Sequence, residues 1–282
     1  MEIKSIDLYM EFDKVRPDKA NGMLRCYLPQ TMKEVNDRRA YPAILILPGG
    51  GYRHLSPREA EPVALRYLAK GFVAFVLEYS VAPCRYPTAF LEAAMAMRCL
   101  RENAQSLSID ASKIAGLGFS AGGHLCGCLA TMSDAAEITA VLGGDVHDYK
   151  PDAVILAYPV VTAGHKSHAA AFDNLCGSDD ALKQRLSLEN CVTCDSSPAF
   201  IWHTYKDQSV SVYNSLVLAM AYEENGASCS LHIFEKGIHG LSTADWGAYP
   251  TGSLQDVSTG LTRWIDMSVD WLADRDIRVK DQ

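Results

Sequence analysis

The sequence has no uninterrupted apolar stretch that approaches the roughly 20 residues of a membrane-spanning helix. It also has no excess of basic residues, because 26 lysines and arginines face 34 aspartates and glutamates, for a formal charge of −8. We therefore expect neither a nucleic acid nor an anionic membrane as its partner. Residues 1–7 lack the basic start and apolar run of a signal peptide, and we expect a cytoplasmic protein.

Cysteine is present but lacks the density of a disulfide scaffold. The nine cysteines are odd in number and spread along the chain, as expected for reduced thiols in a cytoplasmic protein. Cys191 and Cys194 form a C-x-x-C pair, which is compatible with metal or redox chemistry. No second C-x-x-C or paired histidine motif accompanies this pair in the sequence, so we interpret it as structural and predict no metal.

Strand-like and helix-like segments alternate along the chain. Strands are expected at 2–12, 22–28, 41–47, 72–77, in the run that leads into 118, and at 153–158, 199–204 and 229–234. Helices are expected at 58–70, from 87 onward, at 125–132, between the last two strands and at roughly 255–273. This alternation predicts an α/β fold whose mostly parallel central sheet has helices on both faces. No repeat or linker interrupts the sequence, and we predict one domain over 1–282.

Burial can be predicted for two of these segments. The run 41–47 is apolar almost throughout, which is typical of a strand buried on both faces. The helix between the last two strands has four apolar side chains that we expect to point inward: Val210, Tyr213, Val217 and Met220.

A serine stands at the apex of a tight turn in residues 118–122, Gly-Phe-Ser-Ala-Gly. The turn joins a short apolar run to a helix-compatible segment, and its glycines leave room where strand and helix approach. Such a turn holds the hydroxyl of Ser120 above the carboxyl end of the sheet and points the N–H of Ala121 the same way. We interpret Ser120 as a nucleophile; the alternative is a glycine-rich turn with an incidental serine.

Two further candidates follow strands near the end of the chain. Asp207 comes just after the strand expected at 199–204, and His239 just after the one at 229–234. A serine hydroxyl is a poor nucleophile until a histidine takes its proton, and a carboxylate fixes the tautomer of that histidine. Ser120, Asp207 and His239 therefore form the predicted catalytic set, in the chain order expected for an α/β-hydrolase.

Other histidines and acids compete for these roles. His203 and His232 lie within expected strands and are interpreted as packing residues, and His124 as an anchor of the serine turn. Four histidines stand in loops or short segments with no strand end nearby: His54, His147, His165 and His168. Five acids are alternatives to Asp207 but do not follow the penultimate strand: Asp145, Asp148, Asp179, Asp180 and Asp195.

Three consecutive glycines, Gly49 to Gly51, directly follow the strand at 41–47. They let the backbone approach a ligand closely and aim its N–H groups at it. A flexible turn is the plain alternative, and a phosphate cradle is disfavoured because neither G-K-[ST] nor G-x-G-x-x-G accompanies the run. An oxyanion hole shared with Ala121 is the function that this loop fits best.

Five segments in this order resemble the α/β-hydrolase esterases, above all the acetyl-esterase and acetylxylan-esterase-like branch related to the hormone-sensitive-lipase group. They are residues 48–52 (PGGGY), 78–83 (EYSVAP) and 118–124 (GFSAGGH), and the loops that hold Asp207 and His239. The resemblance runs from about residue 40 to the C-terminus. It implies a serine carboxylesterase without metal or organic cofactor that acts on small acyl esters, often acetylated sugars.

The resemblance also implies that the N–H groups of Gly50 and Gly51 hold the oxyanion together with that of Ala121. One position departs from the family pattern, because Pro48 stands where the family usually has a histidine that supports this loop. The departure puts the geometry of the loop in question and leaves the predicted catalytic residues in place.

Four aromatic residues follow or flank these loops and are candidates to line the acyl or sugar pocket, with core packing as the alternative: Tyr52, Tyr86, Tyr158 and Trp246. The expected partner is a small-molecule ester, and the sequence indicates no oligomeric state. Two other functions stay open: an amidase or exopeptidase with the same catalytic residues, and a binding protein that has lost catalysis. The absence of room for an access-restricting domain weighs against the first, and the presence of His239 against the second.

Overall fold

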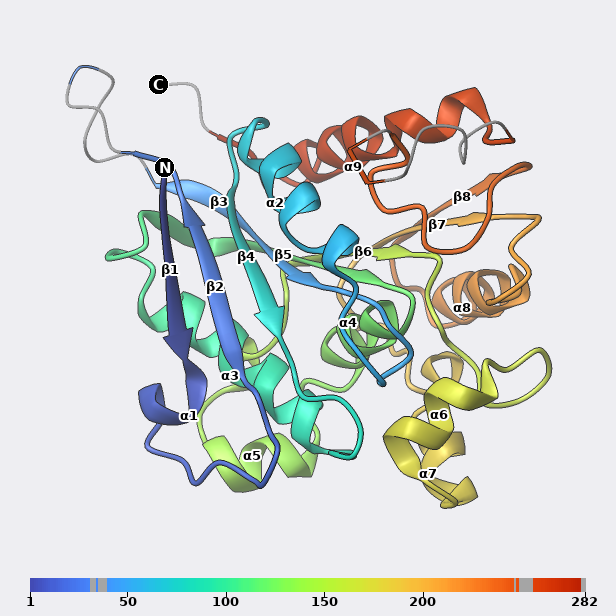
Figure 1. The fold of residues 1–282 in the computed structure, drawn as a ribbon, viewed down its shortest axis with the longest axis horizontal. Coiled ribbons are helices and arrows are strands. Elements are labelled where there is room, and N and C mark those ends of the chain that lie inside the picture. The colour runs from blue at the N-terminus through green and yellow to red at the C-terminus, as the bar shows by residue number, and fades with distance from the viewer. Residues whose placement is uncertain (31–33, 35–39, 246, 249–255, 280–282) are drawn as a thin grey trace.

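One sheet of eight strands runs through the part of the chain that the computed structural model describes, which is residues 1–30, 34, 40–245, 247–248 and 256–279 (Figure 1). Its strands are β1 (Glu2–Asp7), β2 (Met23–Leu28), β3 (Tyr41–Leu47), β4 (Val73–Glu78), β5 (Ile109–Phe119), β6 (Ala153–Ala157), β7 (Ala199–Thr204) and β8 (Cys229–Phe234). They lie in the order β1-β2-β4-β3-β5-β6-β7-β8. The β1–β2 and β2–β4 pairs are antiparallel and all others are parallel, which confirms the predicted mostly parallel sheet.

Strand β3 lies near the centre of the sheet, where both of its faces are covered. It pairs with β4 on one side and β5 on the other, and every residue from Pro42 to Leu47 is buried. Its side chains alternate between two core clusters, with Ala43, Leu45 and Leu47 in one and Ile44 and Ile46 in the other. A strand buried on both faces needs apolar side chains at every position, so the continuous apolar run predicted this placement correctly.

Helices cover both faces of the sheet (Figure 1). They are α1 (Leu8–Glu11), α2 (Glu61–Leu68), α3 (Thr88–Glu102), α4 (Ala121–Thr131), α5 (Ala136–Leu142), α6 (Ala169–Cys176), α7 (Asp180–Arg185), α8 (Tyr213–Glu224) and α9 (Trp264–Ala273). Apolar side chains of α3, α4 and α8 pack in one core cluster, and those of α2 and α9 in the other. No single helix of the described residues is long and apolar enough to cross a membrane; α4 and α5 reach that length and composition only together, across a bend of 81°.

The first strand is shorter than the sequence pattern predicts. A strand is expected over 2–12, but β1 ends at Asp7 and helix α1 follows. The side chain of Asp7 caps this helix by accepting hydrogen bonds from the backbone N–H groups of Tyr9 (3.1 Å) and Met10 (3.3 Å). An aspartate in this position stabilises the first turn of a helix, and this local effect overrides the strand pattern.

Helix α8 (Tyr213–Glu224) turns only part of its predicted apolar face to the core. Tyr213 and Met220 are 36% and 59% exposed, although both are predicted to point inward. The buried face of the helix includes Asn214, whose Oδ1 atom accepts the backbone N–H groups of Val161 (2.9 Å) and Thr162 (3.2 Å). The prediction is confirmed for Val210, which is buried, and for Val217, which packs against the core. It was wrong for Tyr213 and Met220, because a buried backbone segment needs hydrogen-bond partners and a polar side chain of α8 supplies them.

Candidate active site

Ser120 lies at the turn between β5 and α4, in a backbone conformation that side chains rarely adopt (φ 53°, ψ −116°). The flanking glycines make this turn possible. A Cβ atom on Gly118 would lie 2.2 Å from the carbonyl oxygen of Gly122, and one on Gly122 would lie 2.1 Å from that of Leu47. The sequence prediction of a strained serine turn between strand and helix is therefore confirmed.

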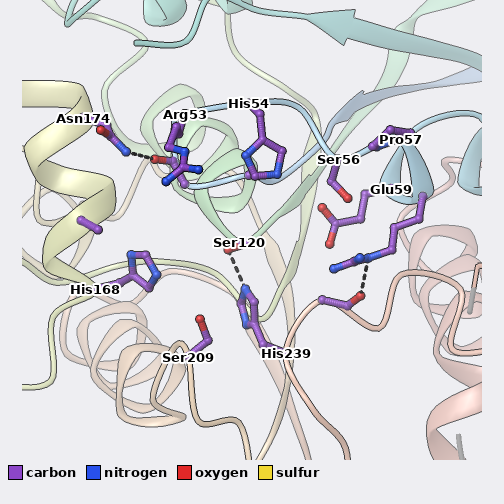
Figure 2. Close-up of a pocket in the computed structure, with 15 residues that line it drawn as sticks. Arg53, His54, Ser56, Pro57, Glu59, Ser120, His168, Asn174, Ser209 and His239 are labelled. Carbon is purple, nitrogen blue, oxygen red and sulfur yellow. Dashed lines mark hydrogen bonds between the residues drawn. The ribbon is translucent and has the colours of Figure 1, made fainter. Parts of the chain in front are cut away.

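His239 bridges Ser120 and Asp207. Its Nε2 atom lies 2.8 Å from the Oγ atom of Ser120, and its Nδ1 atom lies 2.6 Å from the Oδ2 atom of Asp207 (Figure 2 draws the first contact). Since an ionised carboxylate only accepts hydrogen bonds, Nδ1 donates to Asp207 and Nε2 accepts from the serine hydroxyl. The three residues follow β5, β7 and β8, whose carboxyl ends meet at one edge of the sheet.

The carboxylate of Asp207 is buried, yet its surroundings keep it ionised. Its Oδ1 atom accepts the backbone N–H groups of Ser209 (2.8 Å) and Val210 (2.9 Å). Burial raises the pKa of Asp207, but hydrogen bonds from His203 and His239 outweigh that effect and hold the pKa well below its usual range. Asp207 therefore carries its negative charge beside His239 at neutral pH.

His203 is a site residue that the sequence interpretation missed, since it is predicted only to pack within a strand. Its side chain is fully buried, with Nδ1 lying 2.7 Å from the Oγ atom of Ser215 and Nε2 lying 2.9 Å from the carbonyl oxygen of Val210. A carbonyl oxygen only accepts, so Nε2 carries the proton, and that atom lies 3.4 Å from the Oδ2 atom of Asp207. The one signal in the sequence is its position at the end of β7, four residues before Asp207.

The glycine loop after β3 is held by buried side chains from elsewhere in the chain. The Oε2 atom of Glu59 accepts the backbone N–H of Gly49 (2.8 Å), and its Oε1 atom accepts the hydroxyl of Tyr158 (2.8 Å). The hydroxyl of Tyr79 donates to the carbonyl oxygen of Pro48 (2.6 Å). These contacts support the loop in which Pro48 replaces the histidine that the resembled esterases usually have.

Gly50 and Gly51 line the same cavity as the serine hydroxyl. Gly50 has a φ of 127°, and a Cβ atom there would lie 2.0 Å from the carbonyl oxygen of His54. Helix α6 reaches this loop through Asn174, whose Nδ2 atom donates to the carbonyl oxygen of Gly51 (2.8 Å; Figure 2). Among the hydrogen bonds of the described residues, none uses the N–H groups of Gly50, Gly51 or Ala121, so these three donors are available to a ligand.

A cavity of about 450 Å³ opens beside the serine (Figure 2). Its lining comprises Gly50, Gly51, Arg53, His54, Ser56, Pro57, Arg58, Glu59, Ser120, His168, Ala170, Asn174, Ser209, His239 and Gly240. His54 and His168 therefore belong to the site, although neither directly follows a strand in the sequence. They reach the cavity because the loop after β3 and the start of α6 fold over the carboxyl edge of the sheet.

The three described tyrosines that are predicted to line the pocket make their contacts elsewhere in the protein. The hydroxyl of Tyr52 donates to the Nδ1 atom of the buried His124 (2.8 Å). Tyr86 stacks on a phenylalanine of α3, and Tyr158 lies edge-on to the histidine that bridges the site, with ring centroids 5.0 Å apart. None of the three belongs to the cavity lining, and their contact with substrate stays a prediction; the fourth candidate, Trp246, lies outside the described residues.

All nine cysteines are free thiols. Cys191 is half-buried, its Sγ atom lies 3.2 Å from the carbonyl oxygen of Arg185 and 3.4 Å from that of Ser187, and burial raises its pKa to about 11. Cys194 is exposed. Within the described part of the chain, no three histidine, cysteine, aspartate or glutamate side chains are placed together to hold a metal ion.

The sequence matches a protein-family model described as BD-FAE over residues 24–222. It is 36% identical over 218 residues to an endo-1,4-beta-xylanase B of Butyrivibrio fibrisolvens, an alignment that covers 74% of this chain and 34% of that protein. It is 29% identical over 252 residues to an acetylxylan esterase of Xylanibacter ruminicola. That alignment covers 86% of this chain and 48% of that protein. The chain thus spans between about a third and a half of the length of these relatives.

Solved structures of ester hydrolases resemble this one along nearly its whole length. An acetyl ester-xyloside bifunctional hydrolase from Caldicellulosiruptor lactoaceticus has a TM-score of 0.81 at 30% identity, covering 98% of this chain and 97% of that chain. The carboxylesterase Cest-2923 from Lactobacillus plantarum WCFS1 has a TM-score of 0.83 at 26% identity and covers 100% of both chains. The resemblance to α/β-hydrolase esterases found in the sequence is confirmed.

Replacing Glu59 by alanine should destabilise the fold, because the N–H of Gly49 and the hydroxyl of Tyr158 would lose a buried acceptor. Each unsatisfied buried group costs about 1–3 kcal/mol, so the free energy of unfolding in urea should fall by at least about 2 kcal/mol. The control is Glu224→Ala, at an exposed position of α8, which should change it by less than about 0.5 kcal/mol. Equal effects of the two substitutions would contradict the supporting role of Glu59.

Proposed function

The chain belongs to the BD-FAE family and has the α/β-hydrolase fold, and we propose that it is an ester hydrolase that releases short acyl groups, acetyl above all, from polar alcohols such as sugars. One observation carries this proposal. An unbroken line of hydrogen bonds runs from Asp207 through His239 to Ser120 and ends in a cavity lined by glycine backbone. The same line disfavours the alternative of a binding protein that has lost catalysis.

Acylation begins when the Oγ atom of Ser120 attacks the carbonyl carbon of the ester. His239 takes the hydroxyl proton at Nε2 as the new C–O bond forms, since that atom already accepts the hydrogen bond of the serine. The carbonyl oxygen becomes an oxyanion, which the N–H groups of Gly50, Gly51 and Ala121 stabilise. When the tetrahedral intermediate collapses, His239 gives its proton to the leaving alcohol and the acyl group remains on Ser120.

A water molecule then takes the place of the alcohol. His239 removes a proton from the water as its oxygen attacks the acyl carbon, and returns that proton to the Oγ atom of Ser120 when the acid leaves. His239 is a cation in both half-reactions, and the buried negative charge of Asp207 stabilises it. The Nε2–H of His203 lies 3.4 Å from the same Oδ2 atom of Asp207 that His239 contacts.

The cavity wall favours a small acyl group and a polar alcohol. Among the described residues that line it, glycines aside, only Pro57 and Ala170 have apolar side chains, so a fatty acyl chain would meet few apolar side chains. The other lining side chains carry hydrogen-bonding groups that suit the hydroxyls of a sugar. The acetylxylan esterase and the acetyl ester-xyloside hydrolase among the compared proteins support the same class of substrate.

Changing Asp207 to asparagine should lower the turnover of an acetyl ester by about ten-thousand-fold, because the amide favours the wrong tautomer of His239. The matched control is Asp195→Asn, at an exposed acid that the sequence offers for the same role, and it should leave turnover unchanged. The thermal unfolding midpoints of both variants show whether the fold is kept. Loss of turnover in Asp195→Asn alone would show that the proposed acid is the wrong one.

The kcat/KM of the protein should be higher for nitrophenyl acetate than for nitrophenyl butyrate or nitrophenyl octanoate. Each methylene buried in a dry pocket contributes up to about 0.8 kcal/mol, roughly fourfold in specificity, and this cavity has few apolar side chains for such a gain. Acetate should also be released from a peracetylated xylo-oligosaccharide in a parallel assay. A steady rise to octanoate, without acetate release from the sugar, would overturn the substrate class and leave the proposed mechanism standing.

A further inference from the structure

The active-site cavity has a basic wall, although the whole chain carries a formal charge of −8. Arg53, Arg58, His54 and His168 all line it. The only acidic side chain of the described residues in this lining is Glu59, which is buried and whose two oxygens accept hydrogen bonds from within the protein. The cavity wall therefore presents two guanidinium groups, while the oxygens of its one carboxylate already accept hydrogen bonds within the protein, so an anionic ligand would be attracted to the arginine side of the wall.

Arg53 is exposed and forms no ion pair with any described residue. Other surface arginines of the chain form ion pairs with carboxylates; for example, the Nη2 atom of Arg25 lies 2.6 Å from the Oε1 atom of Glu78. The backbone N–H of Arg53 donates to the carbonyl oxygen of Gly50 (3.0 Å), so its side chain starts from the loop proposed to hold the oxyanion. Arg53 thus presents its positive charge to the same cavity as the serine hydroxyl.

His168 lies on the same side of the serine as Arg53 in the close-up view (Figure 2). Its Nδ1 atom accepts the backbone N–H of Ala171 (3.2 Å), so the proton of the neutral ring is on Nε2, which is a donor. Burial lowers the pKa of His168, so the ring is neutral at pH 7. A guanidinium fork suits the two oxygens of a carboxylate, and a neutral N–H donor of the same cavity lining can add a further hydrogen bond to a bound ester.

We propose that this wall selects esters that carry a carboxylate, which Arg53 binds while Ser120 attacks the ester carbonyl. The inference rests on the function proposed above. The carboxylate belongs either to the alcohol half, as in an acetylated acidic sugar, or to the acyl half, as in the half-ester of a dicarboxylic acid. Because Arg53 is exposed, water and salt weaken the attraction, so it sets selectivity among esters and leaves the cleavage chemistry to the serine and histidine.

Two pairs of substrates separate these cases, each comparing a carboxylate with its primary amide. In the first pair the group is on the alcohol: an acetylated methyl glucuronoside and its uronamide, assayed by acetate release. In the second it is on the acyl chain: the 4-nitrophenyl half-ester of adipic acid and 4-nitrophenyl adipamate, assayed by nitrophenol release. In at least one pair, kcat/KM should be about fivefold higher for the carboxylate than for the amide at low ionic strength. That pair shows whether Arg53 binds the alcohol half or the acyl half of the ester.

Substitutions and salt then test whether Arg53 is the cause. Arg53→Gln should bring the carboxylate-to-amide ratio close to one. An ionic strength of about 1 M should do the same for the unsubstituted protein, since the screening length falls to about 3 Å. The matched control Arg263→Gln removes an equal charge from an exposed residue outside the cavity lining, and it should keep the ratio.

The outcomes distinguish this inference from the function on which it rests. A carboxylate preference absent from both pairs, or one that persists in Arg53→Gln, would overturn the inference, while hydrolysis of the neutral amides would leave the proposed function standing. Failure of the unsubstituted protein to hydrolyse any of the four esters would overturn the proposed function and the inference with it.

Discussion

Close packing of α4 against the end of β3 is the constraint on which the rest of the site depends. A Cβ atom on Gly122 would lie 2.1 Å from the carbonyl oxygen of Leu47 and 2.4 Å from that of Pro48. This contact sets Ser120, two residues before Gly122, beside the glycine loop that begins where β3 ends. One backbone contact therefore places both the serine and the N–H groups proposed to hold the oxyanion. A side chain at position 122 would force α4 and the end of β3 apart.

Two buried carboxylates, those of Asp207 and Glu59, position the parts of the site that the packing of α4 on β3 does not, namely His239 and the glycine loop. Asp207 accepts two backbone N–H groups and lies 3.4 Å from His203, and in this position it orients the ring of His239. Glu59 holds the glycine loop and the hydroxyl of Tyr158, whose ring packs against that of His239. A buried charge without partners is costly, so each carboxylate depends on its donors as much as they depend on it. The two networks meet at His239, which contacts Asp207 of one network and the ring of Tyr158 of the other.

Features set by local sequence could be predicted, and features set by distant partners could not. The apolar run at 41–47 predicted a buried strand, and positions directly after strands predicted that Asp207 and His239 lie close together, because parallel strands end at one edge of the sheet. The role of Glu59 could not be predicted, because its partner Tyr158 is 99 residues away in the chain. The burial of Tyr158 could not be predicted for the same reason. Its position near a loop indicated a place in the pocket, but its hydroxyl donates to the distant Glu59 and its ring is buried in the core.

A covalent intermediate on Ser120 is the most direct test of the proposed chemistry. The protein is mixed with nitrophenyl acetate, quenched in acid within a single turnover, digested and examined by mass spectrometry for an added acetyl group. We expect one acetyl group, carried by the peptide that contains Ser120, and its loss as hydrolysis proceeds. An acetyl group on a different residue, or full turnover by a Ser120→Ala protein with no acylated peptide, would contradict the mechanism.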